Sequence, residues 1–79
     1  DNKMNNMLEK KLNGYREDLK ELNNDDLLFE YRFSCSEVER FRQLTKKDSD
    51  NKYLQTRFEY EKQCKRICKE EVLSRMGGF

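Results

Sequence analysis

Matched apolar positions on either side of one polar break constrain the fold of this chain more than any other feature. The break, Asp-Ser-Asp-Asn at 48–51, holds no apolar side chain, and helix-forming sequence flanks it. In an antiparallel helical hairpin, facing residues have position numbers with a constant sum. The apolar pairs Phe41 with Phe58, Cys35 with Cys64, Tyr31 with Cys68 and Leu27 with Val72 each sum to 99, so their midpoint falls within the break.

This pairing predicts a long antiparallel hairpin of two helices, over about 25–47 and 51–76. At about 100° per residue, the apolar positions of each arm fall on one inward face. Val38 departs from the pattern, because it would meet Glu61. The inward stripe of the first arm is Leu27, Leu28, Tyr31, Cys35, Val38 and Phe41; that of the second is Leu54, Phe58, Cys64, Cys68, Val72 and Met76, with Tyr60 and Ile67 at one edge.

A second polar break, at 23–26, separates the hairpin from an additional helix predicted over about 4–22. Short Asn and Asp side chains in such a break cap the following helix by accepting its unpaired backbone N–H groups. Gly77 and Gly78 suit the left-handed end of the last helix. The additional helix carries one narrow apolar seam, formed by Leu8, Leu12, Tyr15, Leu19 and Leu22.

The expected fold class is therefore all-α, a single domain over residues 1–79 that forms a three-helix bundle or a helix-mediated oligomer such as a homodimer. The formal net charge is +1, so no global field attracts nucleic acid or an anionic membrane. No stretch approaches the roughly 20 apolar residues that span a bilayer. Three cysteines without a recognisable export signal indicate reduced thiols, and hence a cytoplasmic protein.

Catalysis and metal binding are disfavoured by the residues that the chain lacks. It has no His, the usual general base near neutral pH, so Ser and Thr lack their commonest activating partner. Cys35, Cys64 and Cys68 would supply three thiolates to zinc, but no His completes the ligand set. All three fall on the inward stripes, where free Cys packs as a small hydrophobe. We expect no enzymatic activity, no cofactor and no metal.

Residues 25–47 also carry a second apolar face that the hairpin does not use. Phe29, Phe33 and Leu44 lie nearly opposite the inward stripe. Two interpretations remain open at this point: the N-terminal helix folds back and covers them, or they stay exposed, or cover a second copy, as a protein-binding patch. For the second interpretation, the predicted partner-binding residues are Leu28, Phe29, Phe33 and Leu44.

The last helix carries a basic ridge that suggests an alternative function. Lysine and arginine side chains spaced along one helix can follow a phosphate backbone. Acidic residues at 59, 61, 70 and 71 flank this ridge, and Glu61 with Lys65 forms an ordinary i,i+4 pair on a solvated face. The candidate nucleic-acid residues are Lys62, Lys65, Arg66 and Lys69. A third interpretation is a self-assembling structural protein that associates through the seam of residues 4–22.

One family resemblance narrows the first interpretation. The segment 25–30, Asp-Asp-Leu-Leu-Phe-Glu, and the segment 67–72, Ile-Cys-Lys-Glu-Glu-Val, with Arg75, resemble the Sda family of sporulation checkpoint inhibitors. Small proteins of Bacillus phages and prophage-like elements are similar too, although here both arms are longer and the N-terminal helix is an addition. The resemblance implies a phage-like, non-enzymatic hairpin that binds and inhibits a bacterial regulatory protein, either a sporulation histidine kinase or the replication initiator. Leu27, Leu28, Phe29 and Phe33 match the family's pattern.

Overall fold

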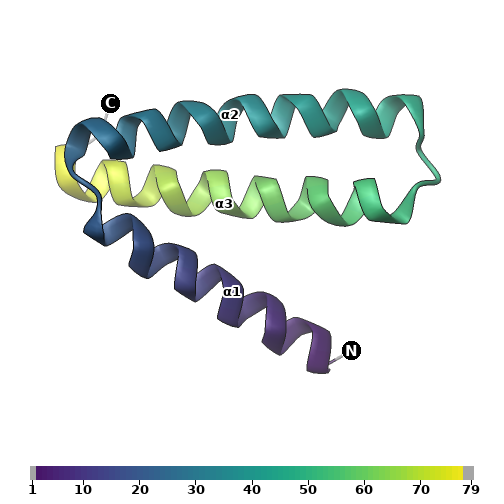
Figure 1. Ribbon diagram of the computed structural model, residues 1–79, viewed down its shortest axis with the longest axis horizontal. Helices are drawn as coiled ribbons and strands as arrows, with labels where there is room; N and C mark the ends of the chain where they lie inside the picture. Colours follow the sequence, from purple (N-terminus) through teal and green to yellow (C-terminus); the bar gives the residue numbers. More distant parts are fainter. Residues whose placement is uncertain (1, 78–79) are drawn as a thin grey trace.

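Three α-helices make up the fold, and two of them form an antiparallel hairpin. The computed structural model describes residues 2–77, with side chains from residue 6 onward. The helices are α1 (Asn2–Glu21), α2 (Asn24–Lys47) and α3 (Lys52–Met76), and the described residues form no strand. α2 and α3 run side by side, while α1 ends at the open end of the hairpin and its N-terminal part lies away from the two arms (Figure 1). The all-α hairpin is confirmed.

Local chemistry sets the helix ends close to the predicted positions. The side chain of Asn23 accepts a hydrogen bond from the backbone N–H of Asp26 at 2.8 Å, and Asn51 caps α3 in the same way at 3.1 Å. Gly77 ends α3 in the left-handed region, at φ 73°, where glycine has no steric penalty. Gly78, predicted to share this role, lies outside the described residues.

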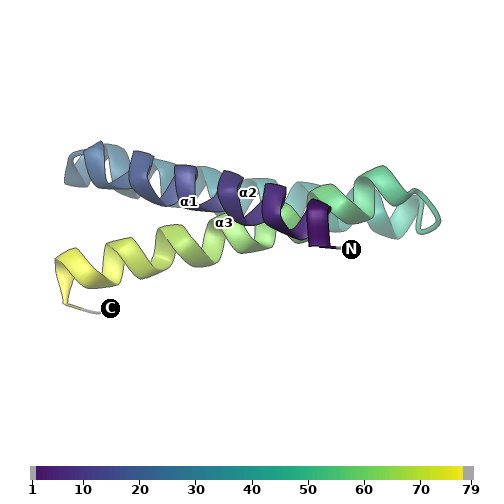
Figure 2. The same cartoon turned by 90° about the horizontal axis from the view of Figure 1, so that it is seen from below.

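Contacts between the two arms agree with the predicted register. The guanidinium carbon of Arg42 lies 5.6 Å from the ring centroid of Phe58, and that of Arg57 lies 4.9 Å from the ring of Phe41. The position numbers of these pairs sum to 100 and 98, on either side of the expected 99. The arms cross at a shallow angle when seen from the perpendicular side (Figure 2), as helices that pack side chains into grooves do.

Glu61, the polar exception in the predicted pairing, is buried in the interface between the arms at 9% exposure. A buried carboxylate without a partner would be strongly unfavourable. Arg57, one turn earlier, donates to it at 2.8 Å and thereby makes the position tolerable. The predicted pairing of Glu61 with Lys65 is wrong, because the carboxylate is directed to Arg57 instead.

The core lies toward the open end of the hairpin, where all three helices meet. The inward stripes are correct in outline, but Met76 is 36% exposed and does not belong to the core. The seam of α1 is used only in its C-terminal half, because α1 diverges and leaves Leu8 41% exposed. The buried cluster at this end consists of Leu19, Leu27, Ile67, Cys68 and Val72, with Leu12, Tyr15, Leu22, Leu28 and Tyr31 packed against it. Val38, Phe41 and Cys64 are buried farther along the hairpin.

Candidate functional site

The outer face of α2 presents two exposed phenylalanines one helical turn apart. Phe29 is 72% exposed and Phe33 is 52% exposed. We call these two residues the phenylalanine pair. Of the two interpretations left open by the sequence, the one in which the N-terminal helix folds back over them is wrong, because both rings remain open to solvent.

Tyr15 shows why α1 does not cover this face. Its hydroxyl donates to the carboxylate of Glu30 at 2.8 Å and lies 3.4 Å from the hydroxyl of Ser34. Burial raises the pKa of Tyr15, so the hydroxyl keeps its proton. At about 100° per residue, the flank with Glu30 and Ser34 points away from the outer face. α1 is therefore held against the side of the hairpin.

Arg75 holds the C-terminal end of α1 against α3. Its guanidinium donates to the backbone carbonyls of Leu22 at 2.6 Å, Leu19 at 2.8 Å and Lys20 at 3.3 Å. Glu71 orients it through an ion pair at 2.8 Å. The last carbonyls of a helix have no intrahelical partner and favour a cation. In the sequence Arg75 stands out only through the family resemblance, and its contact with α1 could not be predicted because no local signal links the two.

The remaining predicted partner-binding residues do not join the phenylalanine pair. Leu28 is half-buried and packs against the core. Leu44 is half-buried and lies 11 residues beyond Phe33, about 16 Å along the helix. Between them Arg40 donates to both carboxylate oxygens of Glu37, each at 2.9 Å. The compact site on this face is therefore the phenylalanine pair alone.

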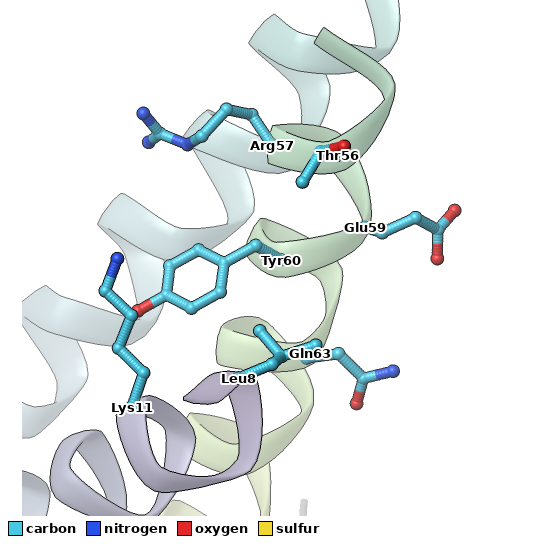
Figure 3. A pocket seen from close by; sticks show the side chains of 7 residues that line it. All are labelled: Leu8, Lys11, Thr56, Arg57, Glu59, Tyr60 and Gln63. Carbon is cyan, nitrogen blue, oxygen red and sulfur yellow. The ribbon is translucent and has the colours of Figure 1, made fainter. Parts of the chain in front are cut away.

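A groove that no sequence pattern predicted opens where α1 diverges from α3. Its volume is about 640 Å³, and Tyr60 extends across it toward Lys11, whose ammonium lies 5.3 Å from the ring centroid (Figure 3). Burial raises the pKa of Tyr60 to about 12. Glu59 and Gln63 point away from the groove, so its polar groups do not converge on one point. The lining residues are Leu8, Lys11, Thr56, Arg57, Glu59, Tyr60 and Gln63.

The three cysteines are free thiols within the helical packing. Cys64 and Cys68 are buried and Cys35 is half-buried. Burial raises the pKa of Cys64 and takes that of Cys68 to about 11, so both thiols are protonated near neutral pH. Across residues 2–77, no three Cys, Asp or Glu side chains gather as metal ligands would. None of the helices described is apolar over a length that would cross a bilayer.

The fold thus defines a small all-α protein, a helical hairpin with a third helix docked at its open end. Comparison of the chain with protein-family models, with curated proteins and with solved structures finds no match. The indications of function are therefore the surfaces that the chain itself presents.

Proposed function

We propose that this chain is a non-catalytic protein-binding module that docks onto a partner through the phenylalanine pair, Phe29 and Phe33. The observation that supports this proposal is their 72% and 52% exposure on a chain in which 42% of residues are charged. Aromatic side chains buried at an interface commonly supply much of its binding energy. Two of them one turn apart match the way an amphipathic helix anchors in an apolar groove.

The proposed mechanism is steric inhibition of a bacterial regulatory protein. A rigid hairpin that covers a helical surface of its target would block the assembly or domain movement for which the target needs that surface. The resemblance to Sda suggests one candidate target, the dimerisation stem of a sporulation histidine kinase, and the similarity to phage proteins suggests a second, the replication initiator. Neither candidate requires catalytic groups in this chain.

The test compares the binding of Phe33→Ala and the parent chain to each candidate target by isothermal titration calorimetry. Phe33 is half-exposed and makes no core contact, so we expect helicity to be retained and affinity to fall more than tenfold. Tyr53→Ala, which removes a 64% exposed aromatic at the loop end of α3, is the matched control and should bind normally. Unchanged affinity of Phe33→Ala would remove Phe33 from the site, whereas a large loss of helicity would place it in the core.

A further inference from the structure

The flank of the hairpin opposite α1 is strongly basic and draws on both arms. Two contacts show which flank α1 occupies. Tyr15 of α1 donates to Glu30 of α2, and Lys11 of α1 lies over the ring of Tyr60 of α3. Within about 60° of the opposite direction on each helix, α2 and α3 carry seven basic residues and two acidic residues, Asp25 and Glu39. We call this flank the basic face; it consists of Arg32, Arg42 and Lys46 from α2 and Lys62, Lys65, Arg66 and Lys69 from α3.

Phe58 shows directly that the two arms bring their cations together here. The guanidinium carbon of Arg42, from α2, lies 5.6 Å from the centroid of its ring. The ammonium of Lys62, from α3, lies 4.5 Å from the same centroid. Two positive charges from different helices therefore meet over one half-buried aromatic ring. The basic ridge predicted on the last helix is thus one half of a wider surface.

Two of the four acidic residues expected to neutralise the ridge are directed elsewhere. Glu61 is paired with Arg57 in the interface between the arms, and Glu71 is paired with Arg75 on the α1 side, each at 2.8 Å. On the basic face itself Arg42 pairs with Glu39 at 3.1 Å, and at its edge Lys62 pairs with Glu59 at 2.8 Å. Such exposed pairs contribute little and exchange readily for another anion.

We infer that the basic face binds the phosphate backbone of duplex nucleic acid without reading its sequence. The axes of packed helices lie about 8–10 Å apart, a separation between the widths of the minor and major grooves of B-DNA, about 6 and 12 Å. From Arg32 to Lys46 the face extends about 21 Å, the length of roughly six base pairs. Both rows of cations can therefore contact phosphates at the same time.

The surroundings of the face favour a duplex over a single strand or a membrane. Phe58 and Tyr31 are half-buried, so α2 and α3 present no open aromatic ring on this flank for stacking on unpaired bases. Membrane-surface helices bury a broad apolar face, but among the described residues of this flank only Met76, at the end of α3, is a large exposed apolar side chain. The phenylalanine pair points in another direction. This inference is independent of the proposed docking function.

Fluorescence anisotropy with a labelled 20-base-pair DNA duplex of mixed sequence tests the inference. With about four phosphates neutralised, affinity should fall about a hundredfold between 50 and 200 mM salt. Lys65→Gln with Lys69→Gln should weaken binding at least tenfold at 50 mM salt and flatten the log–log salt slope by about 2. Lys10→Gln with Lys52→Gln removes the same charge from α1 and from the outer edge of α3, and should bind like the parent chain.

Three results would overturn the inference. Absence of duplex binding at 50 mM salt would do so outright, and binding instead to vesicles containing phosphatidylserine would assign the face to membranes. Equal loss in the two double variants would show a response to net charge rather than to this face. Phe33→Ala should retain duplex binding, so failure of the docking proposal and failure of this inference remain distinguishable.

Discussion

At the scale of single residues, burial determines how the core responds to alkaline pH. Cys68 is fully buried, and burial raises its pKa from 9.0 to about 11. In the unfolded chain this thiol ionises first, near its ordinary pKa. Its contribution to stability is therefore complete below about pH 9 and is lost as the pH rises toward 11. The raised pKa values of Cys64 and Tyr60 act in the same direction.

We therefore predict that the free energy of unfolding is nearly constant from pH 6 to 8 and decreases steadily from pH 9 to 11. The part due to Cys68 is about 2 kcal/mol, since one pKa unit corresponds to about 1.4 kcal/mol. Urea denaturation followed by circular dichroism at each pH measures it. Cys68→Ala should show a shallower decline than the parent chain. A flat profile up to pH 11 would mean that water reaches the thiol in the folded state.

At the scale of elements, α1 is the least stably packed of the three helices, and Gly14 is one reason. Glycine in a helix interior costs about 1 kcal/mol relative to alanine. A Cβ added at Gly14 would meet no atom within 4 Å, so alanine fits without strain. Gly14→Ala should increase helicity at 222 nm and raise the melting temperature by roughly 4–8 °C if the chain unfolds as one unit.

Gly77→Ala provides the opposite control for this prediction. Gly77 also has open space around it, but its φ of 73° is unfavourable for a residue with a Cβ. The same substitution should therefore stabilise at one glycine and destabilise at the other. Equal effects at both positions would contradict the helical geometry given for α1.

The sequence was most informative about elements whose ends and register depend on local chemistry. The caps at Asn23 and Asn51 and the facing apolar stripes follow from residue type and periodicity, which is why the hairpin could be predicted. The placement of α1 could not, because it depends on Arg75 and Tyr15, polar side chains that find partners far along the chain. An apolar seam alone fits either flank of a hairpin. Whether Phe29 and Phe33 were covered therefore had to be decided by the structure.

At the scale of the whole molecule, α1 completes the core and leaves both candidate surfaces free. Leu19 is almost fully buried against the open end of the hairpin, where Ile67 and Cys68 lie. Burying one such leucine contributes about 1.5–3 kcal/mol, a large share of the roughly 3–5 kcal/mol expected for a core of this size. The phenylalanine pair and the basic face lie on other sides. Both surfaces therefore need α1 to keep the hairpin folded, although no residue of α1 belongs to either of them.

Deletion of residues 1–22 should therefore abolish cooperative thermal unfolding and expose the core to thiol reagents. We predict that Cys68 reacts with N-ethylmaleimide at least a hundredfold faster in the truncated chain, as measured by mass spectrometry of each cysteine peptide. Half-buried Cys35, which lies on the flank away from α1, should change much less and serves as the internal control. Arg75→Gln in the full chain should give an intermediate rate, because it loosens α1 without removing it.

A truncated chain that still protects Cys68 would contradict this role of α1, provided that it is monomeric by sedimentation equilibrium. If it protects Cys68 only as a dimer, a second copy has replaced α1 over the open end. That replacement would show that the apolar surface near Leu27 and Ile67 must be covered, either by α1 or by a second copy of the chain. It would also show that two properties of the hairpin have different origins. Its exposed surfaces are formed by α2 and α3, whereas its stability as a folded monomer comes from the packing of α1 through Leu19, Tyr15 and Arg75.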